Sequence, residues 1–172
     1  MKTLGLVVLL ITLPVIANAW IINPANGHLY DSVPGYHWAE AEANAVALGG
    51  HLVTINDVAE NMWVWNNLVS NWDAWIGLYQ LTGSNEPSDG WVWASGEPVA
   101  YTGWIPGQPN NGGNGNEQWA MMIGNGLWDD REVNGYILGR IGIVEVDPVP
   151  EPSSFIALGT LLAPILVLRR RR

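Results

Sequence analysis

The chain has 172 residues, of which 48% are hydrophobic, and it contains no cysteine. This composition excludes a disordered chain and a disulfide scaffold, and it leaves room for one packed domain. Between positions 20 and 150 there are 15 Asp and Glu residues against 2 Arg residues, a net charge of −13. Such a charge disfavours nucleic acid and anionic membranes as partners and suits cation binding, although a solvated acidic surface explains most of it equally well.

The first 19 residues have the order of a secretory signal peptide. Lys2 precedes an apolar stretch from Leu4 to Ile16, and small residues follow up to Ala19. The alternative is a transmembrane anchor, but this stretch is shorter than the roughly 20 apolar residues that span a bilayer. We therefore expect signal peptidase to cleave after Ala19.

The first strand is predicted at His28–Val33, where apolar residues alternate after a run of turn formers. A helix is predicted next, because apolar residues recur at helical spacing, and Gly49 and Gly50 are expected to end it. The residues of this helix that we expect to face the core are Trp38, Ala41, Ala45 and Leu48.

A short strand is predicted at His51–Ile55. Asp57 followed by Glu60 forms a capping-box pattern that opens a second helix running to about Val69. The residues of this helix that we expect to face the core are Met62, Val64 or Trp65, and Leu68.

Strand signals dominate the rest of the chain. Residues 74–79 and 91–93 are rich in strand formers and flank a turn-rich segment, as in a hairpin. The 25 positions from Ala94 to Gln118 show no periodicity, which a compact domain tolerates mainly when the loop is functional. Three further strands, separated by the turn dipeptides Asn125-Gly126 and Asn134-Gly135, are predicted at 119–123, 127–130 and 137–146. Together these elements define an α+β domain.

The last residues combine three unlike elements: Pro150-Glu151-Pro152, an apolar run from Phe155 to Leu168, and four arginines from Arg169 to Arg172. This order resembles the PEP-CTERM sorting signal of Gram-negative bacteria. The resemblance implies transient insertion into the inner membrane as a transmembrane helix, cleavage at or near the Pro-Glu-Pro box by an exosortase, and delivery to the cell envelope, cell surface or medium. A simple C-terminal membrane anchor is the alternative.

The order of elements, with two early helices, a long irregular loop and closing strands, resembles the C-type lectin-like fold. Trp75-Ile76-Gly77-Leu78 matches the most recognisable core strand of that family. The other segments that carry the resemblance are 38–41, 48–55, 60–61, 106–111, 116–117 and 127–130. The resemblance implies an α+β fold with antiparallel sheets over residues 20–147, between a signal peptide at 1–19 and a sorting signal at 148–172.

Members of this family usually close two disulfides. The positions that would carry them here are Ala45 with Val144 and Trp119 with Val133, and all four are apolar. Apolar residues can fill the same core volume, so the absence of cysteine does not exclude the fold.

Calcium-dependent members of the family bind one ion at the long loop, and two sugar hydroxyls complete its coordination. The residues at the matching positions, which we predict to bind both calcium and carbohydrate, are Gln108, Asn110, Glu117, Asp129 and Asp130. They supply two amide oxygens and three carboxylates, the hard oxygen donors that calcium prefers. In the family the proline at the position of Pro109 follows a cis peptide bond, and we expect the same here.

The sugar preference does not follow from the motif, because Gln108-Pro109-Asn110 mixes the family's mannose-type and galactose-type patterns, and Asp129 replaces the usual asparagine. Trp104 and Trp128 border the loop and are candidates for stacking on a sugar. Large aromatic residues are more often buried, however, so we assign four tryptophans to the core: Trp75, Trp91, Trp93 and Trp128.

No pattern of an enzyme is present. His28, His37 and His51 are not at metal-ligand spacing, and the serines lack a nucleophile elbow. Glu117 with Asp129 or Asp130 has the chemistry of a glycosidase pair, but their spacing does not show the separation which that mechanism requires.

The sequence therefore predicts an exported carbohydrate-binding module that uses calcium to hold an extracellular or surface polysaccharide. The resemblance to PEP-CTERM proteins supports the polysaccharide as ligand, because such sorting signals accompany polysaccharide-rich envelopes and biofilms. The alternative is a calcium-independent structural or protein-interaction module of the cell surface or biofilm matrix. The two hypotheses differ in whether ligand retention requires the metal.

Overall fold

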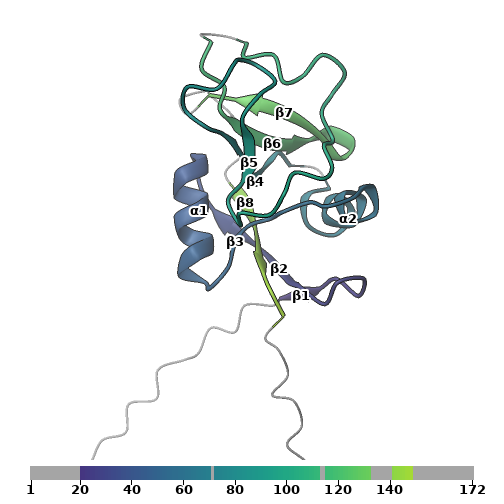
Figure 1. Cartoon of the computed structure of the whole chain (residues 1–172). Helices are drawn as coiled ribbons and strands as arrows, with labels where there is room; N and C mark the ends of the chain where they lie inside the picture. Colours follow the sequence, from purple (N-terminus) through teal and green to yellow (C-terminus); the bar gives the residue numbers. More distant parts are fainter. Residues whose placement is uncertain (1–19, 71, 113–114, 133–140, 149–172) are drawn as a thin grey trace, which may run out of the picture.

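The computed structural model describes residues 20–70, 72–112, 115–132 and 141–148 (Figure 1). The predicted signal peptide and nearly all of the predicted sorting signal lie outside these ranges. Within them, no helix is long and apolar enough to cross a membrane.

One mixed sheet forms the centre of the domain. Its strands are β1 (Ile21–Ile22), β2 (Leu29–Pro34), β3 (His51–Leu52), β4 (Ala74–Gln80), β5 (Trp91–Trp93), β6 (Trp119–Ile123), β7 (Leu127–Arg131) and β8 (Ile141–Val146). The order along the sheet is β1-β2-β8-β4-β6-β7, with β3 paired to β8 and β5 paired to β4. In Figure 1 the end of the domain with β6, β7 and the long loop lies opposite the end with β1.

The expectation of antiparallel sheets is wrong for one pair of strands. Strand β4 runs parallel to β8, with Ala74 opposite Ile141 and Trp75 opposite Gly142. A parallel pair needs a long crossover connection, and the 60 or so residues between these strands supply one. Strand β1, a two-residue strand that pairs with β2, was not predicted from the sequence.

The two helices lie on opposite sides of the sheet (Figure 1). Helix α1 (Trp38–Ala47) begins as predicted and buries Ala41 and Ala45, whereas Leu48 is 40% exposed, because it lies beyond the last helical turn. Helix α2 (Val58–Val64) is capped by Asp57, whose side chain accepts a hydrogen bond from the Glu60 N–H at 2.8 Å. A π-helical turn, η1 (Trp65–Val69), continues it.

One prediction for α2 is wrong: Met62 is 39% exposed, and the polar Asn61 is buried in its place. The Asn61 amide donates to the Gly126 carbonyl at 2.8 Å and accepts from Trp128 Nε1 at 2.8 Å. Because both of its polar ends are satisfied, Asn61 can replace an apolar core residue at little cost.

The core has two clusters of buried apolar side chains. The larger one includes Ile76, Leu78, Trp93 and Trp128, whereas Trp91 is only partly buried. The smaller one contains Ala45 and Val144, the residues at one of the family's disulfide positions. Both are fully buried, so apolar packing occupies the place of this bridge. For the second pair, Trp119 is partly buried and Val133 lies outside the described residues.

Candidate functional site

Strand β7, which follows the short turn η2 (Gly124–Gly126), holds the long loop by its backbone. The Trp128 N–H donates to the Gly103 carbonyl at 2.8 Å, and the Ile105 N–H donates to the Trp128 carbonyl at 2.9 Å. The Trp128 ring is fully buried, edge-on to Trp93, Tyr101 and Trp104. The hypothesis that Trp128 stacks on a sugar is therefore wrong, and its assignment to the core is confirmed. Trp104 stays partly exposed beside the loop.

The residues after Pro109 turn their backbone toward Asp130. The Gln108–Pro109 peptide bond is cis, as expected. The Asp130 carboxylate is buried and accepts hydrogen bonds from the Asn110 N–H at 3.1 Å and from the Asn111 N–H at 2.7 Å. This contact ties the loop motif to β7, so two elements separated by 20 residues reach one place.

Glu117 closes the loop from the other side. Its N–H donates to Asn111 Oδ1 at 2.9 Å, and its Oε2 accepts from the Gly112 N–H at 2.5 Å. A Cβ added to Gly112 would lie 2.8 Å from Asn110 Oδ1 and 3.0 Å from Glu117 Oε2. Two of the predicted ligand oxygens therefore border one small space at Gly112.

Asp129 is held differently from the other four. It is buried at 6% exposure, and its Oδ2 lies 2.6 Å from Arg131 Nη2 in an ion pair along β7. Residues i and i+2 of a strand share a face, which explains the pairing. Burial raises the pKa of Asp129, Arg131 opposes this rise, and the charges of Asp130 and Asp73 add to it. Burial also raises the pKa of Glu117, with further contributions from Asp130 and Asp129.

Two predicted ligands carry buried oxygens without a donor. Gln108 Oε1 and Asp129 Oδ1 have no hydrogen-bond partner among the described residues. Buried acceptors normally have a partner, and a hard cation is one that amide and carboxylate oxygens favour. The donor set thus fits calcium chemically. Over the described ranges His, Cys, Asp and Glu side chains form no metal-binding group of three or more, so such a site needs the amides of Gln108 and Asn110.

Sequence reasoning missed three residues of this region. Asn111 and Gly112 supply the backbone and side-chain contacts that join Asp130 to Glu117, and Arg131 pairs with Asp129. Arg131 had a signal in the sequence, because an arginine two positions after an aspartate on a predicted strand shares its face. The roles of Asn111 and Gly112 had none, since they follow from the path of an irregular loop.

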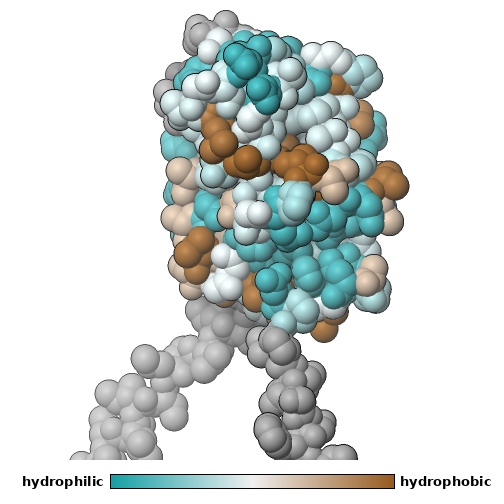
Figure 2. Space-filling model, viewed as in Figure 1, coloured by the Kyte–Doolittle hydropathy of each residue, from teal (hydrophilic) through white to brown (hydrophobic). Residues whose placement is uncertain are grey.

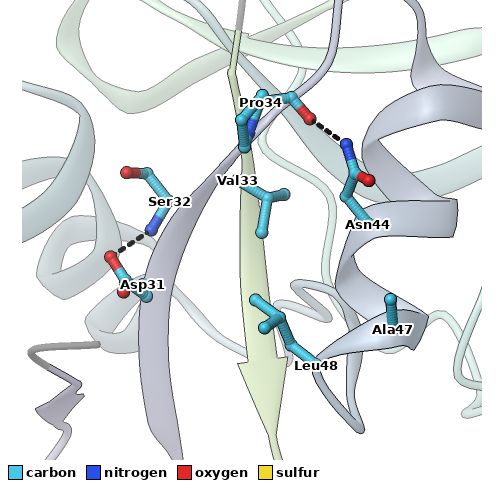
Figure 3. A pocket seen from close by; sticks show the side chains of 7 residues that line it. All are labelled: Asp31, Ser32, Val33, Pro34, Asn44, Ala47 and Leu48. Atoms are coloured by element: carbon cyan, nitrogen blue, oxygen red, sulfur yellow. Dashed lines mark hydrogen bonds between the residues drawn. The ribbon is translucent and has the colours of Figure 1, made fainter. Parts of the chain in front are cut away.

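Two surface cavities lie away from this loop. One, of about 360 Å³, lies between β2 and α1 and is lined by residues such as Val33, Asn44 and Leu48 (Figure 3). The other, of about 340 Å³, lies beside the start of α2 and includes His28 and Glu60. Hydrophilic side chains gather over α2 and the β1–β2 connection on the face shown in Figure 2.

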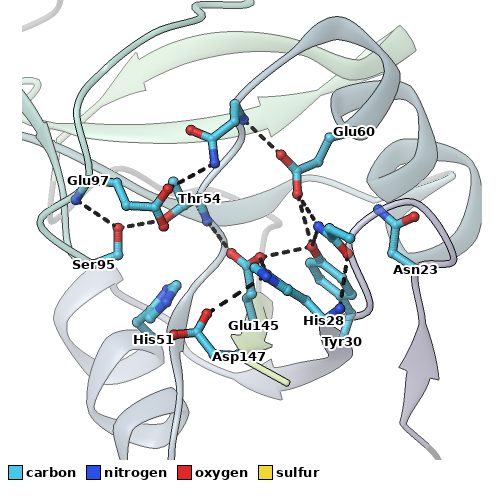
Figure 4. A network of polar contacts seen from close by, with 12 residues as sticks. Asn23, His28, Tyr30, His51, Thr54, Glu60, Ser95, Glu97, Glu145 and Asp147 are labelled. Carbon is cyan, nitrogen blue, oxygen red and sulfur yellow. Dashed lines mark hydrogen bonds and ion pairs between the residues drawn. The ribbon is translucent and has the colours of Figure 1, made fainter. Parts of the chain in front are cut away.

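Two residues that line the second cavity, His28 and Glu60, belong to a polar network centred on Glu145 of β8 (Figure 4). Glu145 is 2% exposed, and its Oε1 lies 2.5 Å from His28 Nδ1 and 2.8 Å from Tyr30 Oη. Its Oε2 accepts from the Thr54 N–H at 2.8 Å. Tyr30 Oη also lies 2.9 Å from Glu60 Oε1. This cluster, the Glu145 network, joins β2, α2 and β8.

Two helices flanking a mixed sheet, with a long loop that presents oxygen ligands beside the strand reading Trp-Asp-Asp, are the features of a C-type lectin-like binding domain. The family model of the lectin C-type domain matches residues 35–136, and the chain belongs to this family. The family binds carbohydrates and is typically not enzymatic.

Known proteins support this assignment. The low affinity immunoglobulin epsilon Fc receptor of Mus musculus is 38% identical over 100 residues, which are 58% of this chain but only 28% of the receptor. The cow C-type carbohydrate-recognition domain of CD23, solved in the presence of a GlcNAc2Man3 oligosaccharide, has a TM-score of 0.65 and 27% identity, and the alignment covers 79% of this chain and 98% of that domain. A calcium-independent type II antifreeze protein shares the fold, with a TM-score of 0.63 at 24% identity over 78% of this chain and 96% of that protein.

Proposed function

We propose that this domain binds glycans through a calcium ion held by Gln108, Asn110, Glu117, Asp129 and Asp130. The observation that carries the proposal is the pair of buried oxygens on Gln108 and Asp129 that have no hydrogen-bond partner among the described residues, since both residues are ligands predicted from the sequence. When bound, calcium would supply a Lewis-acidic centre for sugar hydroxyls. The chain itself provides the oxygens, and the hydrogen bonds from Asn110 and Asn111 fix Asp130.

A second function has support of its own. The Asp130 carboxylate is already engaged by two backbone N–H groups, and Asp129 is already paired with Arg131. A loop organised in this way without metal suits a calcium-independent structural or protein-interaction module. A calcium-independent antifreeze protein with the same fold is a precedent for this alternative.

Thermal unfolding of residues 20–148 in calcium, magnesium and chelator separates the two functions. At a calcium concentration about 100 times the dissociation constant, the native state gains roughly 2.7 kcal/mol, a shift of several degrees in Tm. Glu117→Gln keeps an oxygen for the Gly112 N–H but removes the charge, so it should lose most of this calcium response.

Asp31→Asn is the matched control, because Asp31 also accepts a backbone N–H, from Ser32 at 2.7 Å, and it lies on β2 away from the loop. This variant should respond to calcium like the natural domain. A domain that shows no shift at millimolar calcium would contradict the calcium-dependent function and favour the second one. Retention on immobilised polysaccharides, with release by chelator, then tests the glycan.

We also propose that the chain is exported by a bacterium, and that its two terminal segments are targeting signals rather than parts of the folded domain. The support is the order of charged, apolar and small residues at positions 1–19 and of Pro-Glu-Pro, apolar run and arginines at 150–172. Expression in a host with an exosortase, followed by intact mass measurement, tests this. A mature protein that starts at Trp20 and ends near Pro150 is expected, and an uncut chain would contradict the proposal.

A further inference from the structure

Arg131 is the only Arg or Lys within the described ranges, and it lies directly beside the candidate calcium ligands. Its Nη2 contacts Asp129 Oδ2 at 2.6 Å, and the two side chains are 32% and 9% exposed. The one Arg or Lys side chain within these ranges therefore holds one oxygen of a carboxylate that the proposed metal would also need.

The charges around this pair explain why a cation lies there. Asp130 and Asp73 both repel the Asp129 carboxylate, whereas Arg131 attracts it. Arg131 also attracts the Glu117 carboxylate. In the absence of metal, Arg131 is thus the counter-ion for a group of carboxylates that would otherwise repel one another at close range.

The contact is also incompletely satisfied. Asp129 Oδ1 and Arg131 Nε are both buried and have no hydrogen-bond partner in the described part of the chain. A carboxylate paired with arginine in the best geometry uses both oxygens and two N–H groups. Here the pair uses one oxygen, which leaves the other available to a second cation.

We propose that Arg131 is an internal counter-ion that competes with calcium for Asp129 and so lowers the calcium affinity of the loop. The inference rests on the proposed calcium function, because it concerns regulation of that same site. Arg131 stabilises the metal-free domain, and calcium binding weakens its contact with Asp129. The calcium concentration at which the site fills is then set by a residue that is not a ligand.

The test uses the full chain with Arg131→Gln, which removes the charge, and Arg131→Lys, which keeps it. Two measurements are made: Tm in chelator, and the calcium dissociation constant by calorimetry. Arg131→Gln should melt lower in chelator, because Asp129 loses its counter-ion, and bind calcium about fivefold more tightly. Arg131→Lys should remain close to the natural chain in both. Arg131→Met, which keeps the apolar stem, repeats the test if the glutamine variant does not fold.

Asp129→Asn makes the test specific to the pair. In an Asp129→Asn background, Arg131→Gln should raise the calcium affinity much less, because the carboxylate that the two cations share is gone and only the weaker effect of Arg131 on Glu117 remains. An equal gain in both backgrounds would mean that Arg131 acts only through the net charge of the domain, and would overturn the proposal.

Failure of this inference is distinguishable from failure of the proposed function. If the natural chain binds calcium and Arg131→Gln binds it equally or more weakly, the inference is overturned and the function stands. If only Arg131→Gln binds calcium, Arg131 blocks the site, so the inference stands and the function of the natural chain is wrong. If no variant binds calcium, both are overturned.

Discussion

The Glu145 network and the long loop are both rich in carboxylates, but they differ in how completely their polar atoms are paired. Each carboxylate oxygen of Glu145 and Glu60 has a partner: His28, Tyr30 and Thr54 for Glu145, and Tyr30, Asn26 and Asn56 for Glu60. At the loop, Gln108 Oε1 and Asp129 Oδ1 have none among the described residues.

This difference separates two uses of buried charge. A network in which each carboxylate oxygen has a partner stabilises a unique packing. Buried acceptors without donors destabilise the metal-free domain, and a bound cation can offset this destabilisation. We therefore expect mutations in the Glu145 network to act on stability alone and mutations at the loop to act through calcium.

The largest effect is expected for Glu145→Ala. This change removes the acceptor of the Thr54 N–H and the partner of His28 and Tyr30 in a place that is 2% exposed. The free energy of unfolding should fall by about 3 kcal/mol, as for other buried pairs broken on one side. Urea titration measures it, and the loss should be the same in calcium and in chelator. Glu86→Ala, on an exposed glutamate, is the control. A loss that calcium restores would contradict the separation of the two regions.

A smaller and pH-dependent effect is expected for Glu60→Gln. The Tyr30 hydroxyl has one proton, yet it lies within hydrogen-bond distance of both Glu60 and Glu145. Burial raises the pKa of Glu60, although hydrogen bonds from Asn56 and Tyr30 oppose this rise, and burial also raises the pKa of Tyr30. A raised native pKa means that the stability from Glu60 is complete below its ordinary pKa of 4.5 and is lost as pH rises through the native value.

The stability difference between the natural domain and Glu60→Gln should therefore shrink as pH rises from about 4, by the order of one hydrogen bond, about 1 kcal/mol. Urea titrations of both proteins over a series of pH values measure it. A difference that grows with pH would contradict the raised pKa of Glu60.

The sequence predicted the elements better than the contacts between them. The bounds of β4, β6 and β7 follow from strand-forming residues within one position. The parallel pairing of β4 with β8 was missed, because it joins segments whose relation depends on the fold between them. Asn61 was missed for a similar reason: its burial is satisfied by Trp128 and Gly126, which lie more than 60 residues away.

The same limit applies to the loop. The resemblance predicted five candidate ligands. In the structure the Asn110 N–H donates to Asp130, and side-chain oxygens of Asn110 and Glu117 lie next to Gly112. The strand period indicated that Arg131 shares a face with Asp129, but nothing in composition or periodicity indicated the contacts of Asn111 and Gly112. Irregular loops have no repeating pattern, so the positions of their backbone N–H groups follow only from the folded chain.

The smallest effect on stability, and the sharpest test of the difference between the two regions, is expected for Gly112→Ala. The added Cβ would lie 2.8 Å from Asn110 Oδ1 and 3.0 Å from Glu117 Oε2, so at least one of these oxygens must move. In chelator the free energy of unfolding should change by less than about 1 kcal/mol, because Gly112 lies on a partly exposed loop. Calcium affinity should nevertheless fall about tenfold or more, as it does when metal ligands lose their orientation.

Gly124→Ala is the matched control, because a Cβ there meets nothing within 4 Å. Both substitutions restrict the unfolded chain equally, so the difference between them isolates the contact with Asn110 and Glu117. If Gly112→Ala and Gly124→Ala respond to calcium alike, the space at Gly112 is not part of a metal site. If only Gly112→Ala loses the response while both melt alike in chelator, the loop binds calcium without contributing to the stability of the empty domain, in contrast to the Glu145 network.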